Sequence, residues 1–129
     1  MQQSLQFTNT ITAEQIVIVE NDLMFSQAIE QVLQSAGYGT CVFPSAEALI
    51  DCPDSIDADC FLISMDLPGM SGVELRKQLS VQGKQSPVVF MTTEQLSIHC
   101  DPLIKNRFLQ KPFRGYRLIS AIRNALNIE

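Results

Sequence analysis

The sequence predicts an α/β fold, in which a five-stranded parallel sheet is covered by helices on both faces. The first observation is that five short apolar runs, each typical of a buried strand, are spread along the chain. The second is that most of these runs are separated by segments with helical spacing or helix-capping residues, an alternation typical of parallel sheets. The third is size and composition: 129 residues, 46% hydrophobic and 18% charged, fit one globular domain.

The chain begins with a polar segment, residues 1–14, in which a few apolar side chains are scattered. We expect a loose N-terminal arm there, since chain ends are commonly poorly ordered, followed by a single domain over 15–129. The continuous β-branched run at 16–19 predicts the first buried strand. Asn21 or Asp22 can cap the helix that follows.

Four further strands are predicted along the chain, at 38–43, 59–64, 87–92 and 107–110. The first of these carries glycine and threonine, which favours a position near a sheet edge. Ser45 is expected to cap a short helix. Ser71 and Glu74 have the spacing of a capping box, and the helix that they open is expected to close at Gly83. The last segment, 116–128, has apolar residues on one helical face.

Charge and cysteine content exclude several classes of function. The net charge is −5 and no basic block is present, which argues against direct binding of nucleic acid. No run is long enough to span a membrane and no secretory signal is recognisable, so we expect a cytoplasmic protein. The four cysteines lack metal-ligand spacing, and His99 beside Cys100 supplies too few ligands for zinc. Reduced, mostly packed thiols are therefore expected.

The candidate site follows from the predicted sheet. Sites in parallel α/β sheets lie beyond the carboxyl ends of the strands, at the point where the strand order reverses. The side chains that follow the first, third, fourth and fifth strands are Glu20, Asn21, Asp22, Ser64, Thr92 and Lys111. We expect them to share one edge of the sheet.

Five motifs carry a resemblance over roughly residues 15–127: "IVIVEND", "GYGTCVFPSAEALI", "LPGMSGVEL", "VVFMTT" and "FLQKPF". In this order they resemble the receiver domain of two-component response regulators. The resemblance implies a flavodoxin-like sheet of order 2-1-3-4-5 and a non-enzymatic role in phosphorelay signalling. It also implies a protein partner, which would be a histidine kinase, an output domain or another regulator. Self-association as a homodimer stays open.

In that family, an acidic pair after the first strand and an aspartate at the end of the third hold Mg²⁺ and accept a phosphoryl group. The resemblance maps the acidic pair onto Glu20 and Asn21, and the phosphoacceptor position onto Ser64. The family's switch and phosphate-contact positions map onto Thr92, Phe108, Lys111 and Pro112. The residues that depart from the family are therefore those that would hold the metal and accept the phosphate.

These departures have a chemical consequence. Mg²⁺ prefers hard oxygen ligands that include carboxylates, so Glu20 beside Asn21 and Ser64 is expected to bind it weakly or not at all. A serine hydroxyl also needs an adjacent base to act as a nucleophile. We therefore expect a pseudo-receiver that acts through protein–protein contacts. In it, Lys111 would form an ion pair with Glu20 and Ser64 would hydrogen-bond locally.

Other interpretations stay open at this point. Asp66 or Asp22 could serve an active, Mg²⁺-dependent receiver in altered geometry. However, Asp66 lies two residues beyond the strand end, about 6–7 Å at the rise of a strand, and Asp22 is suited to capping a helix. A flavodoxin-like cofactor binder lacks a supporting G-x-G-x-x-G or phosphate-binding loop, and a Ser64 hydrolase lacks the G-x-S-x-G turn.

The segment between the fourth and fifth strands also departs from the family. Residues 93–105 are weakly patterned and contain His99 and Pro102. Only 16 positions separate Thr92 from Phe108, fewer than the family leads us to expect. We expect the fourth helix to be short or irregular, and the partner-binding face that it forms to be altered.

Overall fold

The computed structural model describes residues 13–52, 57–94 and 107–127. Its centre is a parallel sheet of five strands in the order β2-β1-β3-β4-β5, which confirms the predicted topology. The strands are β1 (Gln15–Val19), β2 (Gly39–Phe43), β3 (Cys60–Ser64), β4 (Val88–Thr92) and β5 (Phe108–Gln110). Each lies within a residue of the range that its apolar run predicts.

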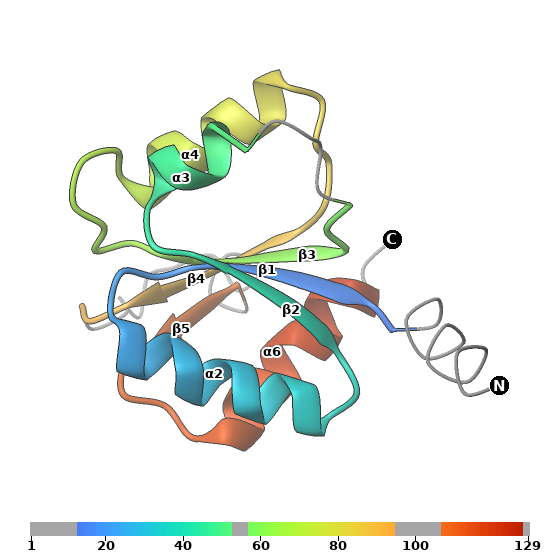
Figure 1. The fold of residues 1–129 in the computed structure, drawn as a ribbon. Coiled ribbons are helices and arrows are strands. Elements are labelled where there is room, and N and C mark those ends of the chain that lie inside the picture. Colours follow the sequence, from blue (N-terminus) through green and yellow to red (C-terminus); the bar gives the residue numbers. More distant parts are fainter. Residues whose placement is uncertain (1–12, 53–56, 95–106, 128–129) are drawn as a thin grey trace, which may run out of the picture.

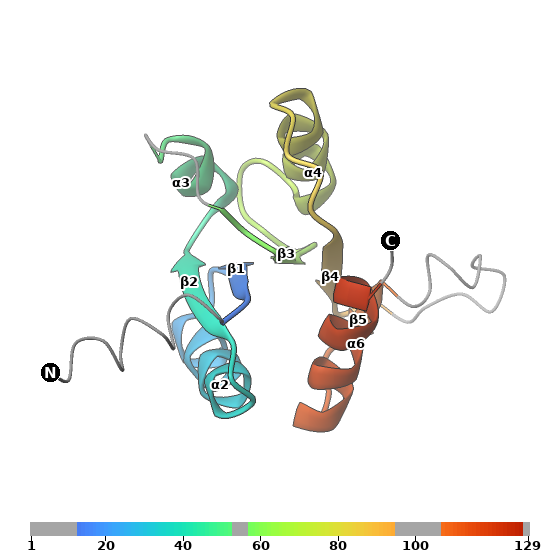
Figure 2. The same cartoon turned by 90° about the vertical axis from the view of Figure 1, so that its right-hand side faces the viewer.

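Four described helices cover the two faces of the sheet, which also agrees with the prediction. They are α2 (Leu23–Ser35), α3 (Ala46–Ile50), α4 (Gly72–Val81) and α6 (Gly115–Asn127). Figures 1 and 2 show α2 and α6 together on one face, with α3 and α4 on the other. The arrangement is thus a sheet between two layers of helices.

The predicted caps explain where three of the helices begin. The side chain of Asp22 accepts a hydrogen bond from the N–H of Phe25 at the start of α2, and Ser45 does the same at α3. Ser71 and Glu74 form both halves of a capping box at α4. Each cap satisfies N–H groups that the first helical turn would otherwise leave without a partner.

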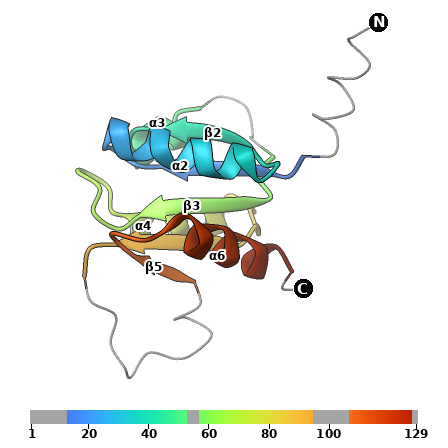
Figure 3. The same cartoon turned by 90° about the horizontal axis from the view of Figure 1, so that it is seen from below.

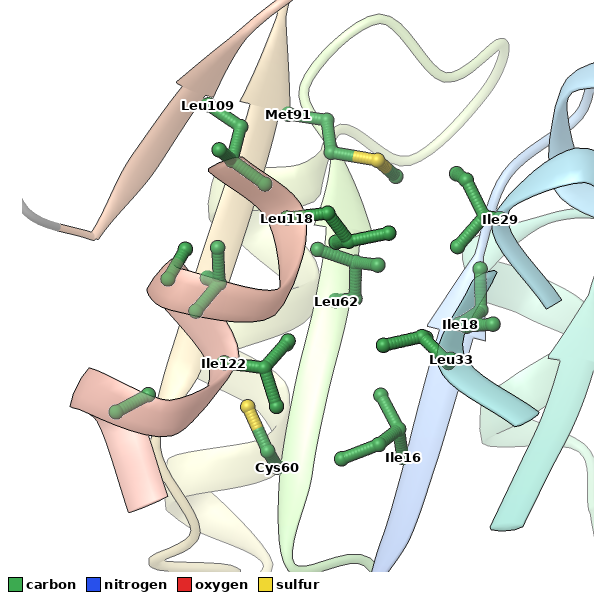
Figure 4. Close-up of a cluster of buried hydrophobic side chains, with 13 residues drawn as sticks. Ile16, Ile18, Ile29, Leu33, Cys60, Leu62, Met91, Leu109, Leu118 and Ile122 are labelled. Atoms are coloured by element: carbon green, nitrogen blue, oxygen red, sulfur yellow. The ribbon is translucent and has the colours of Figure 1, made fainter. Parts of the chain in front are cut away.

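Side chains alternate between the two faces of β1 and β3, so each face has its own core. Toward α2 and α6 lie Ile16, Ile18 and Leu62, which pack against Ile29, Leu33, Leu118 and Ile122 as Figure 4 shows. Toward α3 and α4 lie Val17, Val19, Phe61 and Ile63 with Leu75 and Leu79. Fully burying such a side chain stabilises the fold by about 1.5–3 kcal/mol, which makes the central strands the rigid base of the site.

The strand register brings the strand ends together on one edge. Val19 is paired with Ile63, and Ser64 with Met91 in the neighbouring strand. Thr92, the last residue of β4, is paired with Gln110, the last residue of β5. Figure 3 shows the strands running side by side in one direction. The residues that follow β1 and β5 therefore lie at the same edge as Ser64.

The cysteine prediction holds only in part. Cys60 is buried, and burial raises the pKa of its thiol to about 12, so it is a packed and unreactive group. Cys52 is half-buried, but Cys41 is exposed on β2, so the expectation of a packed thiol is wrong for Cys41. Because β2 is an edge strand with a half-covered surface, it leaves this side chain open to solvent.

Two sequence predictions fall largely outside the described residues. Of the predicted N-terminal arm, only residues 13 and 14 are described. Most of the segment that would hold the fourth helix also lies outside the described residues. His99, Cys100 and Pro102 belong to that segment, so the short fourth helix stays a prediction. Within 13–52, 57–94 and 107–127, no helix is long and apolar enough to cross a membrane.

Candidate functional site

The candidate site lies at the carboxyl ends of β1, β3, β4 and β5. Glu20 follows β1 directly, whereas Ser64 and Thr92 are the last residues of β3 and β4. All three are buried, with exposed fractions of 2%, 0% and 4%. Lys111 follows β5, and its side chain is 16% exposed. The topology therefore brings together four of the predicted side chains from different strands.

Lys111 and Glu20 form the predicted ion pair. The Lys111 Nζ lies 2.9 Å from Oε1 of Glu20 and 3.4 Å from Oγ of Ser64, to which it also donates. The ammonium group is 4.8 Å from the centre of the Phe25 ring, within the range of a cation–π contact. A buried carboxylate is costly without a counterion, so the lysine compensates a charge that the fold has enclosed.

The second oxygen of Glu20 is also engaged. Oε2 accepts a hydrogen bond from the backbone N–H of Asp22 at 3.0 Å, while Oε1 accepts from Lys111. The backbone N–H of Glu20 in turn donates to the carbonyl oxygen of Phe43 at 3.0 Å. Both carboxylate oxygens are thus committed to partners within the chain, as expected for a buried polar group.

Ser64 hydrogen-bonds locally, as the sequence predicts. Its Oγ accepts from the N–H of Asp66 at 3.3 Å, in addition to the contact with Lys111. Both distances are long, so each bond is weak. Its carbonyl oxygen faces Gly72, where an added Cβ would come within 2.6 Å of it. The turn after β3 can therefore close over Ser64 only because position 72 lacks a side chain.

The two alternative acids have other contacts. Asp22 is exposed, and its Oδ1 accepts from the N–H of Phe25 at 3.0 Å, which makes it the cap of α2. Asp66 is exposed as well, and its Oδ2 accepts from the N–H and the Oγ1 of Thr93 at 3.3 and 3.2 Å. Asp66 thereby ties the loop after β3 to the end of β4. Neither carboxylate takes part in the Glu20–Lys111 contact.

The remaining predicted positions flank this centre. Asn21 and Pro112 are exposed, and the Lys111–Pro112 peptide bond is cis. The hydroxyl oxygen of Thr92 accepts from the N–H of Glu94 at 3.1 Å. Phe108 is partly buried and stacks on Phe90, with the ring centres 5.3 Å apart. The phenyl ring of Phe108 therefore packs into the core layer toward α3 and α4.

Two aromatic side chains belong to the site although the sequence did not single them out. The Phe25 ring lies beneath the Lys111 ammonium group and meets the Phe113 ring edge-on, with centres 5.6 Å apart. Phe113 completes the "KPF" motif, which is a signal that could have been used. Phe25 lies in the first turn of α2, and helical periodicity does not reveal which strand-end residue such a ring contacts.

Glu47 is a further contact that the sequence did not reveal. Its Oε2 accepts from the N–H of Met70 at 2.8 Å and so holds the loop between β3 and α4 against α3. This hydrogen bond favours the charged form and lowers the pKa of the Glu47 carboxyl. In the same loop Gly69 has a φ of +75°, a backbone conformation that glycine adopts readily. Met70 follows Glu47 by 23 positions in the chain, so local sequence patterns do not reveal this contact.

In the described parts of the chain, no group of three or more histidine, cysteine, aspartate and glutamate side chains has an arrangement that could hold a metal ion. The strand-end site offers one buried carboxylate, the hydroxyl groups of Ser64 and Thr92, and one lysine. In chemical terms it is a neutral, hydrogen-bonded centre rather than an acidic cluster.

Known proteins resemble this chain over most of its length. Residues 16–123 match the family model described as the response regulator receiver domain. The transcriptional regulatory protein FixJ of Bradyrhizobium diazoefficiens is 29% identical over 118 residues, which cover 89% of this chain and 58% of FixJ. The response regulator protein TmoT of Ectopseudomonas mendocina is 28% identical over 116 residues, covering 88% of this chain and 53% of TmoT. The chain thus spans about half the length of these curated relatives.

Solved structures give the same fold. The chemotaxis protein CheY4 of Vibrio cholerae superposes with a TM-score of 0.76 at 21% identity, covering 89% of this chain and all of that one. The response regulator StyR superposes with a TM-score of 0.72 at 28% identity, covering 89% of this chain and 60% of StyR. Together with the match over residues 16–123, these findings show that the chain belongs to the response regulator receiver domain family.

Proposed function

We propose that this receiver domain works without the aspartyl-phosphate switch of its family and acts by binding protein partners. The observation that carries the proposal is the ion pair between Lys111 and Glu20, with Ser64 beside it at the end of β3. A cation and an anion already neutralise each other at the place where the resemblance leads us to expect an acidic, metal-binding cluster. The domain is proposed to be a non-enzymatic, cytoplasmic signalling module.

The residues present do not fit a magnesium site. Mg²⁺ demands near-octahedral oxygen ligands and commonly takes one or two carboxylates with water and phosphate. Glu20 is the one buried carboxylate at the centre, and both of its oxygens accept hydrogen bonds from Lys111 and Asp22. Ser64 contributes a neutral hydroxyl. We therefore propose that Mg²⁺ binding is weak or absent.

The chemistry of Ser64 also supports the proposal. A serine attacks a phosphoryl group only when a base takes its proton, and the nearest charged partner of its Oγ is the cationic Lys111. Glu20 is held by that same lysine, so it is a poor base. The hydroxyl is in addition fully buried. These features support a structural role for Ser64 in place of phosphate acceptance.

The partner is proposed to be another protein of a signalling system: a histidine kinase, an output domain or a further regulator. The relatives are named as a transcriptional regulatory protein and a response regulator, and they are about twice as long as the matched region. Close to the site, Leu23 and Met24 at the start of α2 are 67% and 80% exposed, and Tyr116 on α6 is 68% exposed. Apolar side chains of this kind are suited to contacts with a protein partner.

Phosphorylation assays test the proposal directly. The chain is incubated with acetyl phosphate and Mg²⁺, and separately with beryllofluoride and Mg²⁺, and followed by intact mass and NMR. We expect no added phosphoryl group and no saturable shift. The double variant Asn21→Asp/Ser64→Asp is the matched comparison, since it supplies carboxylates at both departing positions, and it is expected to gain Mg²⁺-dependent modification.

A phosphorylated wild-type chain would contradict the proposal. In that case Asp66→Asn and Asp22→Asn locate the acceptor: loss of the phosphoryl group in the Asp66 variant would establish an active receiver with altered geometry. Loss only in Ser64→Ala would instead identify the serine.

A further inference from the structure

A second polar site lies at the opposite edge of the sheet, where β3, β4 and β5 begin. A pocket of about 270 Å³ opens there between the carboxyl-terminal part of α4 and the sheet. We call it the amino-end pocket. Phe61 and Val88, both nearly fully buried, contribute to its apolar wall, and Arg76, Lys84 and Arg107 contribute its charges. Most of its lining residues belong to the end of α4 and to the segment that returns to β4, whose path Figure 1 shows.

The charge of this pocket contrasts with that of the whole chain. Three of the nine lysine and arginine residues line it, although the net charge of the protein is −5. None of the described residues that line it is acidic. The described residues also include no carboxylate that forms an ion pair with Arg76, Lys84 or Arg107. Because no described carboxylate pairs with these three cations, they create a positive potential that attracts anions.

The size and lining of the pocket indicate the kind of anion. A volume of about 270 Å³ is near the lower end of small-molecule sites, so it admits a small ligand. Two arginines supply planar, forked donors, which match the oxygens of phosphate and carboxylate groups. An extended acidic protein would be repelled by the remaining surface of a chain with net charge −5. A compact ligand, in contrast, would contact mainly the positively charged pocket and little of the remaining surface.

We propose that the amino-end pocket binds a small organic anion with two or more negative charges, such as a phosphate ester or a polycarboxylate. Arg76 on α4 and Arg107 before β5 bind its charged groups from two sides of the opening. Lys84 adds a third charge from the loop after α4. The proposal is independent of the strand-end site, since it involves neither phosphoryl transfer nor any residue of the Glu20–Lys111 pair.

An NMR titration of the complete ¹⁵N-labelled chain tests this proposal. Pyrophosphate and citrate are added in separate experiments at low ionic strength, in buffer freed of metal ions by a chelating resin, with sodium chloride at matched ionic strength as a blank. We expect saturable shifts at the backbone amides of residues 76–86, 88 and 107–110, and none with chloride. Arg76→Gln and Arg107→Gln are each expected to weaken pyrophosphate binding about tenfold, because each removes a charge-assisted hydrogen-bonding group.

Lys77→Gln is the matched control. Lys77 neighbours Arg76 on α4 and carries the same charge, but it does not line the pocket. We expect its variant to bind pyrophosphate with an affinity within about twofold of the wild type. Dissolved salt screens the interaction between the ligand and an exposed charge that does not contact it. The spectra of all variants without ligand show whether the fold is retained.

Three results would overturn the proposal. The first is the absence of a saturable shift with either anion. The second is an equal loss of affinity in Lys77→Gln and Arg76→Gln, which would mean that only net charge matters. The third is saturable binding of a short poly-glutamate peptide without binding of either small anion, which would assign the surface to an acidic protein.

Discussion

The two edges of the sheet differ in whether their positively charged side chains are paired with a carboxylate. At the carboxyl edge, Lys111 lies 2.9 Å from the buried carboxylate of Glu20, and the charges cancel within the protein. At the amino edge, the described residues pair no carboxylate with Arg76 or Arg107. The comparison teaches that the same kind of side chain has a structural role where its partner is built in. Arg76 and Arg107, which pair with no carboxylate of the described residues, are the cations that we propose for a ligand.

The largest effect should come from removing the cation at the carboxyl edge. Lys111→Met leaves Glu20, only 2% exposed, without its counterion. Breaking one side of a buried ion pair costs about 3–5 kcal/mol, so we expect a loss of stability of that order. Urea unfolding at neutral pH, followed by circular dichroism, measures the difference.

The double variant Lys111→Met/Glu20→Gln is the control for this prediction. It removes the buried charge together with its partner, so it should lose clearly less stability than Lys111→Met alone. A single-variant loss below about 1 kcal/mol, the range of exposed ion pairs, would mean that solvent already screens this contact.

An intermediate effect is expected at the turn that closes over Ser64. In Gly72→Ala the new Cβ would lie 2.6 Å from the carbonyl oxygen of Ser64, which is backbone and cannot turn aside. Overpacking of this kind costs about 1–3 kcal/mol, and thermal or urea unfolding measures it.

Gly83, near the other edge, provides the comparison for this turn. It has a φ of +86° and nothing within 4 Å of an added Cβ, so only the backbone conformation restricts which residue can replace it. Asparagine tolerates that conformation, and Gly83→Asn should cost only a few tenths of a kcal/mol. Equal losses in the two variants would contradict the close contact at Gly72.

The smallest effect should come from removing a cation at the amino edge. Arg107→Gln breaks no ion pair with any described carboxylate, so the free energy of unfolding should stay within about 0.5 kcal/mol of the wild type. The same urea experiment as for Lys111→Met allows the losses of unfolding free energy in the two variants to be compared directly. A loss greater than about 1 kcal/mol would assign Arg107 a structural partner and weaken the contrast.

The fold could be predicted from the sequence because its signals are local. The buried run of β1 differs from its prediction by one residue, and the caps at Asp22 and Ser45 were visible as residue types in the right places. The ion pair between Glu20 and Lys111 could also be predicted, although 91 positions separate them. Parallel topology alone brings the ends of β1 and β5 to one edge.

Other contacts could not be predicted because packing decides them. The contact between the Phe25 ring and Lys111 is one of them, because only the path of the chain after β5 brings Lys111 against this ring. The amino-end pocket depends on how the end of α4 sits against the starts of three strands. Periodicity assigns a residue to a face of a helix, but it does not determine which distant side chains share a cavity.

The contact between Glu47 and Met70 has a consequence for proton linkage. Because the Met70 N–H favours the ionised carboxyl, the pKa of Glu47 in the folded protein lies below its ordinary value. The stabilisation that this contact provides is therefore fully present above that ordinary value, and is lost as the pH falls through the lower, folded value. Near neutral pH the attachment of the β3–α4 loop to α3 is insensitive to proton concentration, and acid alone weakens it.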